Sequence, residues 1–187
     1  MGIMGGMGPE ATADLFLRVI RATHAKCDED HLRVIIDNNP KMPSRQDAIL
    51  KGGESPVPAM VDTARNLVRA GGDFMIIGAN TPHYFYDDVQ KAIDIPILHI
   101  IDEAVKFTAK AVPGIKKLGV LATTAAMQTR LYHKSCGKFG IEVIEPDDAM
   151  QETIHNAIFS FKYEGLTDKC VSDAVTAARS LTDNGAE

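Results

Sequence analysis

The sequence has few cysteines and no arrangement of histidines that is typical of a metal site. Only three of its 187 residues are cysteines, Cys27, Cys136 and Cys170, and no two of them have CxxC spacing. A scattered, odd set of thiols predicts reduced cysteines in a cytoplasmic protein rather than a disulfide framework. The six histidines include no pair at the spacing of helical ligands, so we expect no metal.

The sequence also lacks a basic block, a membrane span and a signal peptide. Its formal net charge is −5, so we expect no nucleic-acid partner. No apolar stretch approaches the ~18 residues that a membrane span needs. The N-terminus has neither the charged nor the apolar region of a secretory signal. The hydrophobic content of 45% is typical of a globular protein with a core.

Short apolar runs alternate with longer segments of helical periodicity, a pattern that predicts an α/β fold with parallel strands. We expect a strand at the opening "GIMG" and further strands over 32–37, 74–78, 96–100, 117–122 and 141–146. Helices are expected over 9–26, 57–70, 82–92, 101–112, 125–139, 151–162 and 168–182. Residues 40–56 are predicted to form a loop that holds at most one short helix.

The pattern restarts near residues 95–117, which predicts two halves, 1–98 and 99–187. The stretch "GIMGGMGPEAT" (2–12) lies over "GVLATTAAMQT" (119–129), and "ARNLVRAGGD" (64–73) lies over "ARSLTDNGAE" (178–187). We therefore expect two Rossmann-like or flavodoxin-like parallel-sheet halves related by a pseudo-repeat, with the second half truncated at the C-terminus. Chance similarity between matches this short is the alternative.

Three predicted strand-to-helix junctions hold small polar residues, in "GGMGPEAT", "GANTPHYF" and "ATTAAMQT". Parallel α/β sheets bind ligands beyond the carboxyl ends of their strands, where free N–H groups and positive helix ends favour a carboxylate or phosphate. Thr81 is the expected N-cap of the second junction, and Thr123 or Thr124 that of the third. Ordinary helix capping explains any single junction, whereas three convergent junctions favour an anion site. The glycine turn matches neither a P-loop nor a dinucleotide fingerprint.

Two basic side chains are candidates for binding the other end of such a ligand. Arg45, in "NNPKMPSRQDAIL", could grip a carboxylate through two parallel hydrogen bonds, or could be a solvated loop arginine. Lys162, in "SFKYEG", could reach a ligand or complement a helix dipole. His83 is expected to be neutral and hydrogen-bonded rather than a metal ligand. The three cysteines are expected to pack within helices away from the junctions.

Together these motifs resemble the aspartate/glutamate racemase family, the cofactor-independent amino-acid racemases. "GGMGPEAT" resembles the opening turn of the family, "NNPKMPSRQDAIL" its arginine loop, and "NTPHYF" its Asn-Thr-x-His turn. "GVLATTAAMQTRLY" resembles its second-domain strand and helix, and "IHNAIFSFKYEG" the helix with its substrate-side lysine. Each motif alone is weak, but their order and spacing over nearly the whole chain are specific.

The resemblance implies an isomerase that inverts the Cα of aspartate or glutamate without pyridoxal phosphate or another cofactor. It implies a homodimer, and two thiols that flank the substrate Cα, one from each half. One thiol accepts the α-proton while the other donates to the opposite face. The carbanion then needs hydrogen-bond donors around its carboxylate, and the thiolate must form near neutral pH. Carried onto this chain, the substrate-binding residues are Met7, Thr12, Arg45, Asn80, Thr81, Thr124 and Lys162.

Within that set, Asn80, Thr81 and Thr124 would bind the α-carboxylate, Arg45 and Lys162 would bind the side-chain carboxylate, and Met7 and Thr12 would line the site. The chain departs from the family at two positions. The first thiol position is Ala79, whose methyl group cannot move a proton. The second thiol would stand in a Gly-Cys-Thr/Ser-Glu turn, which we expect to follow Glu187.

Three explanations for Ala79 stay open. The chain could belong to a natural branch that uses only the second-half cysteine, it could carry a replacement introduced to trap a ligand, or it could have drifted to another isomerase or lyase activity or to binding without catalysis. The alternatives to a racemase are therefore a non-catalytic binder of acidic amino acids or dicarboxylates and a related cysteine-dependent isomerase or decarboxylase. The choice between aspartate and glutamate depends on how far Arg45 and Lys162 reach.

Overall fold

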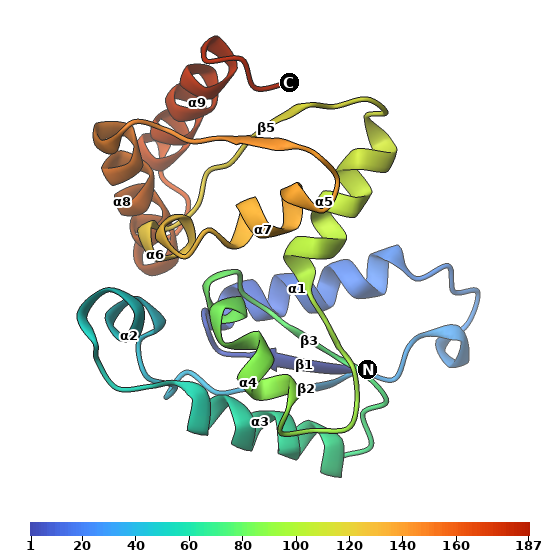
Figure 1. Cartoon of the computed structure of the whole chain (residues 1–187). Coiled ribbons are helices and arrows are strands. Elements are labelled where there is room, and N and C mark those ends of the chain that lie inside the picture. The colour runs from blue at the N-terminus through green and yellow to red at the C-terminus, as the bar shows by residue number, and fades with distance from the viewer. The chain divides into compact units, whose positions relative to one another are not determined.

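The computed structural model describes residues 1–187, which form two compact units, Met1–Ile100 and Ile101–Glu187 (Figure 1). Each unit combines helices with a sheet of parallel strands, so the fold is α/β. The pattern of alternating apolar runs and helical segments predicted this class.

Unit 1 contains a four-stranded parallel sheet in the order β2-β1-β3-β4. Its strands are β1 (Gly2–Gly5), β2 (Ile35–Asn38), β3 (Met75–Ile77) and β4 (Ile97–Leu98). Met4 of β1 pairs with Asp37 of β2 and with Ile77 of β3, so these three strands end at nearly the same level. Because the strands are parallel, the loops that leave their carboxyl ends share one edge of the sheet.

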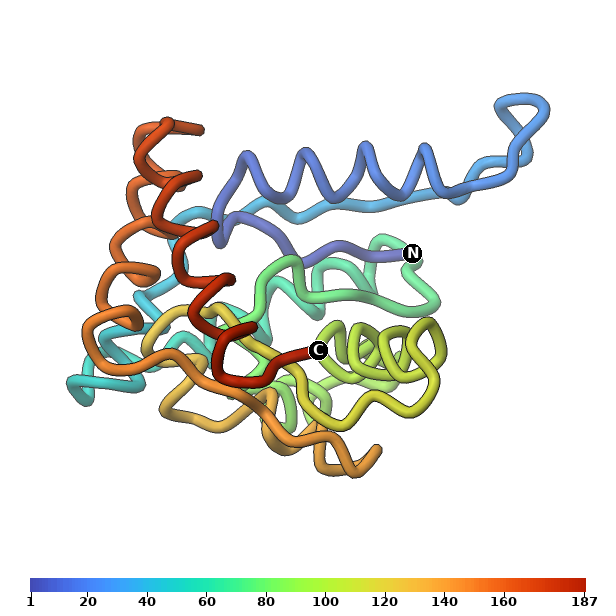
Figure 2. The backbone as a smooth tube through the Cα atoms, turned by 90° about the horizontal axis from the view of Figure 1, so that it is seen from above, coloured from blue at the N-terminus to red at the C-terminus, as the bar shows by residue number.

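The helices of unit 1 are α1 (Pro9–Ala22), α2 (Arg45–Lys51), α3 (Val57–Arg69) and α4 (Tyr86–Gln90), with the 3₁₀ turns η1 (Asp28–Asp30) and η2 (Thr81–Phe85). Helix α3 covers one face of the sheet and α1 lies on the other (Figure 1). The α3 residues Met60, Ala64 and Leu67 join Met4 and Met75 in one buried cluster. Methionine, which is unbranched and flexible, fills irregular gaps in such a core. The segment after α1 turns back and runs beside it, as Figure 2 shows.

Unit 2 holds the two-stranded parallel sheet β5 (Lys117–Gly119) and β6 (Glu142–Ile144). Its helices are α5 (Ile100–Ala111), α6 (Thr124–Gln128), α7 (Leu131–Gly137), α8 (Asp148–Glu164) and α9 (Asp168–Asp183). Small side chains take much of the core, including Ala122, Ala125, Ala126, Ala157 and Ala177. Helices that meet through alanine can approach closely, and α6 lies against α8.

The pseudo-repeat is visible in the way α3 and α9 end. After α3, the N–H groups of Gly71 and Gly72 donate to the carbonyls of Val68 and Leu67 at 2.9 and 3.0 Å. After α9, those of Gly185 and Ala186 donate to Thr182 and Leu181 at the same two distances. Both endings are Schellman motifs, with glycine at φ values of 89° and 92°.

The two helices of the repeat also pack on equivalent strands. A Cβ built on Gly2 of β1 would meet Leu67 at 3.3 Å, and one built on Gly119 of β5 would meet Leu181 at 3.1 Å. These are the glycines and leucines that the sequence alignment of the two halves superposes.

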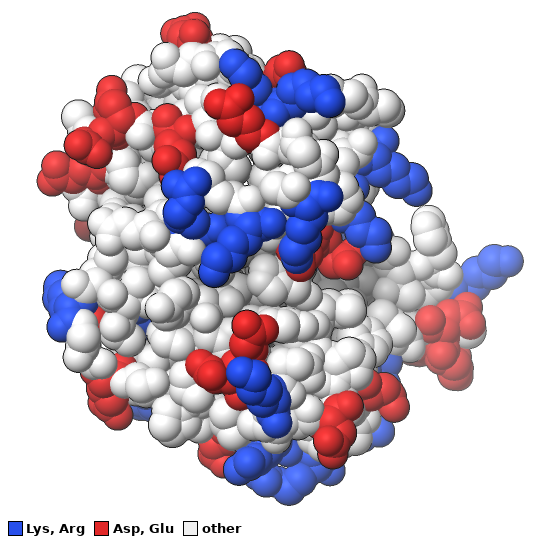
Figure 3. Space-filling view, in the orientation of Figure 1, with Lys and Arg blue, Asp and Glu red and all other residues white.

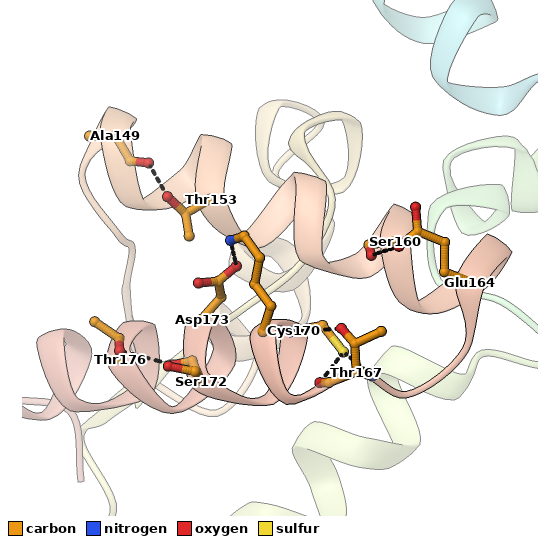
Figure 4. A network of polar contacts seen from close by, with 10 residues as sticks. Ala149, Thr153, Ser160, Glu164, Thr167, Cys170, Ser172, Asp173 and Thr176 are labelled. Carbon is orange, nitrogen blue, oxygen red and sulfur yellow. Dashed lines mark hydrogen bonds and ion pairs between the residues drawn. The ribbon is translucent and has the colours of Figure 1, made fainter.

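The turn between α8 and α9 is fixed by capping contacts (Figure 4). Gly165 ends α8 with a φ of 82°. Thr167 then caps α9, because its hydroxyl accepts from the N–H of Cys170 at 3.2 Å, while the Cys170 Sγ accepts from the N–H of Thr167 at 3.2 Å. The reciprocal contacts satisfy two N–H groups that the helix itself leaves unpaired.

Several predicted boundaries were wrong. The expected helix over 125–139 is two helices, because Arg130 adopts the left-handed conformation with a φ of 55° and breaks the ladder. The expected helix over 82–92 begins as the 3₁₀ turn η2. Strand β2 covers 35–38 instead of 32–37, and α1 ends at Ala22. Cys27 is exposed in the loop before η1, not packed in a helix.

Acidic and basic side chains are both present on each unit in the view of Figure 3. No helix of the structure is both long enough and apolar enough to cross a membrane.

Candidate functional site

Unit 1 brings most of its predicted site residues to one edge of its sheet. Met7 follows β1, and Ala79 and Asn80 follow β3. All three residues lie at the carboxyl edge of the sheet. Met7 and Met42 belong to the buried cluster, and Ala79 packs against it. Helix α2, which begins at Arg45, contacts η2, which begins at Thr81. The arginine loop and the Asn80-Thr81 turn are therefore neighbours.

The glycine turn after β1 is held by Thr12. The Thr12 hydroxyl accepts from the N–H of Gly6 at 3.1 Å and donates to the carbonyl of Gly8 at 3.0 Å. Thr12 is only 2% exposed, so its hydroxyl shapes the turn. Gly6 has a φ of 89°, and a Cβ there would lie 2.2 Å from the backbone carbon of Asn39. Only glycine lets the β1 and β2 loops approach this closely.

The Ala79-Asn80 turn is held by a buried histidine. Nδ1 of His83 lies 2.9 Å from the carbonyl of Ala79 and 3.2 Å from that of Asn80. Nε2 accepts from the N–H of Ile100 at 3.3 Å. An acceptor at Nε2 and carbonyls at Nδ1 require the neutral form with its proton on Nδ1. His83 thus holds the carbonyls of Ala79 and Asn80 in place.

The cap of this turn differs from the prediction. Asn80, not Thr81, is the N-cap residue of η2, and its side chain makes no capping bond. The Asn80 side chain is exposed, whereas Thr81 is half-buried. The side-chain amide of Asn80 therefore lies at the carboxyl edge of the sheet. It carries two N–H donors that a ligand can reach.

Arg45 is the first residue of α2 and is braced by its own loop. Its Nη1 donates to the carbonyl of Pro43 at 2.9 Å and to that of Met42 at 3.3 Å. Ser44 caps the helix by accepting from the N–H of Asp47 at 3.2 Å. A guanidinium carries five N–H donors in a rigid fork, and these two contacts help to orient the group.

In unit 2 the turn between β5 and α6 is bound by helix α8. Gln151 donates from Nε2 to the carbonyl of Ala122 at 3.0 Å. His155, one helical turn further, accepts from the N–H of Thr124 at Nδ1 over 3.2 Å, and the Thr124 hydroxyl lies 3.0 Å from the same nitrogen. Thr124, Gln151 and His155 line a pocket of about 560 Å³.

Lys162 lies in the last turn of α8, two turns beyond His155, and is exposed. Its Nζ is 5.8 Å from the centre of the Phe159 ring and 5.6 Å from that of Tyr163. The Phe159 ring is in turn 4.8 Å from that of His155. Seven residues of helix span about 10 Å, so Lys162 lies well along α8 from the Thr124 pocket and does not line it.

None of the three thiols stands at a strand-to-helix turn. Cys27 is exposed in a loop, and burial raises the pKa of the Cys136 thiol in α7. Hydrogen bonds from the side chain and backbone of Thr167 lower the pKa of the Cys170 thiol at the start of α9. The side chain at position 79, where the resemblance places a thiol, is a methyl group.

Sequence reasoning missed the histidine contacts. His83 was expected to be hydrogen-bonded, but its link from the Ala79 carbonyl to Ile100 was not foreseen. His155 was not singled out at all. A signal existed, because Gln151, His155 and Lys162 recur at helical spacing on one stripe of α8. The roles of Met7, Thr12, Arg45, Asn80, Thr81, Thr124 and Lys162 toward a substrate stay predictions.

Comparison with known proteins identifies the family. A family model described as Asp/Glu/Hydantoin racemase matches residues 4–187. The broad specificity amino-acid racemase RacX of Bacillus subtilis (strain 168) is 32% identical over 167 residues, which are 87% of this chain and 70% of that protein.

Solved structures of racemases share the fold of this chain. An aspartate racemase of Picrophilus torridus superposes with a TM-score of 0.86 at 26% identity, over 98% of this chain and 76% of the other. An aspartate racemase homologue from Pyrococcus horikoshii OT3 shares the fold with a TM-score of 0.67 at 24% identity, over 97% of this chain and 96% of the other. By its sequence and its fold, the chain belongs to the Asp/Glu/Hydantoin racemase family.

Proposed function

We propose that this chain is an amino-acid racemase that inverts the Cα of aspartate or glutamate without pyridoxal phosphate. The observation that carries the proposal is family membership over residues 4–187, together with the Asn80-Thr81 turn at the carboxyl end of β3. A turn of this kind presents hydrogen-bond donors to an anion.

Both units carry residues with a proposed role toward the substrate. In unit 1, Asn80 and Thr81 bind the α-carboxylate and Arg45 binds the side-chain carboxylate, while Met7 and Thr12 shape the site. In unit 2, Thr124 binds the α-carboxylate and Lys162 binds the side-chain carboxylate. The support is positional: Arg45 lies on a helix that contacts η2, and Thr124 lines a pocket.

Position 79 limits the chemistry. Racemisation breaks the Cα–H bond on one face, leaves a carbanion whose charge the carboxylate-binding donors stabilise, and returns a proton to the opposite face. Ala79 can neither accept nor donate that proton. Because Ala79 leaves its face of the Cα without a proton-transferring thiol, we expect slow exchange that is biased toward the enantiomer whose proton is moved on the other face by another acid, base or water.

The test is exchange of the Cα hydrogen in D₂O. The protein is incubated separately with L-aspartate, D-aspartate, L-glutamate and D-glutamate, and loss of the Cα–H signal is followed by NMR. We expect exchange that is faster from one enantiomer of a pair than from the other. Equal rates from both enantiomers would contradict the one-sided mechanism.

The variant Ala79→Cys sharpens this test. A positioned acid or base contributes about 10²–10⁴-fold to a proton transfer, so the slower enantiomer should gain by that order. Ala79→Ser is the matched control, because it adds a similar volume without an acidic thiol. Cys27→Ser, which removes an exposed thiol, should change neither rate.

Ala79 also favours a second candidate, binding without catalysis. A binder would take up aspartate or glutamate, measured by calorimetry, and exchange no Cα hydrogen even over long incubation. A related isomerase or decarboxylase acting on dicarboxylates would instead bind malonate or maleate more tightly than aspartate. Competition between these acids and aspartate separates the three functions.

A further inference from the structure

Helix α8 contacts the turn between β5 and α6 through His155. His155 Nδ1 is the acceptor for the backbone N–H of Thr124 at 3.2 Å, and it lies 3.0 Å from the Thr124 hydroxyl oxygen. Gln151, one turn earlier, anchors the preceding carbonyl of Ala122. The turn is therefore held at two points by one face of α8.

The hydrogen bond from the Thr124 N–H defines the state of the imidazole. An N–H donor needs a lone pair, so Nδ1 carries no proton and the histidine is neutral, with its proton on Nε2. The Thr124 hydroxyl can bond to the same nitrogen only by donating its own proton. In this state both donors of Thr124 point at His155, and its oxygen can only accept.

A carboxylate has no proton to donate, so it cannot use Thr124 in this state. Protonation of Nδ1 reverses the arrangement. An imidazolium N–H cannot accept from the Thr124 N–H, and it donates to the Thr124 hydroxyl oxygen instead. Both donors of Thr124 are then released, and the charge on His155 adds attraction for an anion.

The charged groups that line the same pocket as His155 come from three places in unit 2. Arg130 lies between α6 and α7. Glu145 follows β6, and Asp148 and Glu152 lie on α8. The carboxylates can also receive the ammonium group of an amino acid, so the lining suits a ligand that carries both charges.

We propose that His155 is a positioning residue that sets whether Thr124 can bind a carboxylate. Unprotonated, it holds both donors of Thr124; protonated, it releases them to the ligand. This inference rests on the proposed function, in which Thr124 binds the α-carboxylate of an acidic amino acid. Ligand binding is accordingly coupled to the uptake of one proton at Nδ1.

The first experiment is calorimetry of L-aspartate binding in two buffers of different ionisation enthalpy. A proton taken up on binding makes the apparent enthalpy depend on the buffer. We expect net proton uptake on binding, and a dissociation constant that rises with pH. Nitrogen NMR of the free protein reports the His155 tautomer independently of any ligand.

Two variants show whether His155 acts through its hydrogen bonds to Thr124 or only through packing. In His155→Asn, the amide oxygen takes the place of Nδ1 as a permanent acceptor, so binding should be weak and independent of pH. In His155→Leu, the donors of Thr124 are released at every pH, so binding should be tighter than in His155→Asn and without proton uptake. His24→Asn, at an exposed loop histidine, is the matched control and should behave like the wild type.

Steady-state exchange kinetics add a readout that a structural role would not give. The pH dependence should appear in KM, with kcat little changed, and should be absent from both His155 variants. Binding without proton uptake would contradict the proposed role of His155, and so would a His155→Asn variant that keeps the pH dependence of the wild type. Neither result would contradict the proposed racemase activity. Failure of aspartate and glutamate to bind at any pH would remove the proposed function and the proposed role of His155 together.

Discussion

Helices α3 and α9 end in the same way but belong to units that are built differently. Each helix buries a leucine against a glycine of the first strand of its unit, Leu67 on Gly2 and Leu181 on Gly119. Each then closes with the same pair of hydrogen bonds. In both helices the leucine is followed four residues later by a glycine of positive φ, and the helix ends there in the same way.

The surroundings of these equivalent endings differ. Unit 1 places α3 on a four-stranded sheet, in a cluster with large flexible side chains such as Met4, Met60 and Met75. Unit 2 has a two-stranded sheet and a core with many alanines. The turns differ as well, because a glycine loop held by Thr12 opens α1, whereas Thr124, held by His155, opens α6. The repeat therefore preserves helix packing and varies the turns that follow the first strand of each unit.

The leucine pair gives the largest expected effect. Leu67→Ala and Leu181→Ala should each lower the free energy of unfolding by about 2–5 kcal/mol, because each removes a fully buried side chain and leaves a cavity. Hydrogen exchange followed by mass spectrometry locates the loss. Amides of β1 and β3 should lose protection in the first variant, and those of β5 and β6 in the second.

The matched controls for this pair are exposed leucines, one in each unit. Leu17 is 46% exposed and Leu166 is 75% exposed, so replacing either by alanine should change the free energy of unfolding by less than about 0.5 kcal/mol. If either buried variant lowered protection equally in both units, the units would unfold together and the comparison between them would fail.

Much of this architecture could be predicted because it depends on local patterns. Alternating apolar runs and helical stripes gave the α/β class, and the superposition of Leu67 on Leu181 and Gly71 on Gly185 gave the repeat. The order of strands and junctions also pointed to the edge where Met7 and Asn80 lie. These features depend on periodicity and turn chemistry, which neighbouring residues determine.

The features that the sequence did not predict have different physical causes. No glycine or proline marks the break at Arg130, where a non-glycine residue adopts a positive φ. Leu32 was assigned to a strand because it is apolar, yet it is 51% exposed and lies before β2. His155 meets Thr124 across 31 residues, so its role became visible only once α8 was placed against the turn.

The glycine pair gives a smaller and more uniform effect. Gly71 and Gly185 both have positive φ, and a Cβ at either would meet nothing closer than 3.7 Å. Gly71→Ala and Gly185→Ala should therefore each cost about 1–2 kcal/mol, from backbone conformation alone. Chemical denaturation of the purified variants measures this.

Gly137→Ala is the control for that pair, because Gly137 ends α7 without a positive φ and with open space around it. It should be neutral or stabilise the protein by up to about 1 kcal/mol, since alanine restricts the unfolded chain. A cost at Gly185 much below that at Gly71 would mean that the second helix ending contributes less to stability than its geometry implies.

The smallest expected effect is a pH dependence of stability in unit 2, caused by protonation of His133. Burial lowers the pKa of His133, with Glu145 raising it and Arg130 lowering it further. Its Nδ1 is buried without a hydrogen-bond partner, and Nε2 lies 3.4 Å from Glu145. Protonation would add a donor at Nδ1 that no acceptor meets.

Because the folded pKa of His133 is below the unfolded value of about 6.5, the folded state binds fewer protons than the unfolded state near that pH. The stability from neutral His133 is thus fully present above about pH 6.5 and is lost as the pH falls through the lower folded value. His133→Gln should remove that part of the decline between pH 7.5 and 5.5, seen by urea denaturation and as retained amide protection in β6 and α7. The exposed-site variant His24→Gln should keep the full decline, and an identical pH response in His133→Gln and wild type would show that His133 titrates alike in both states.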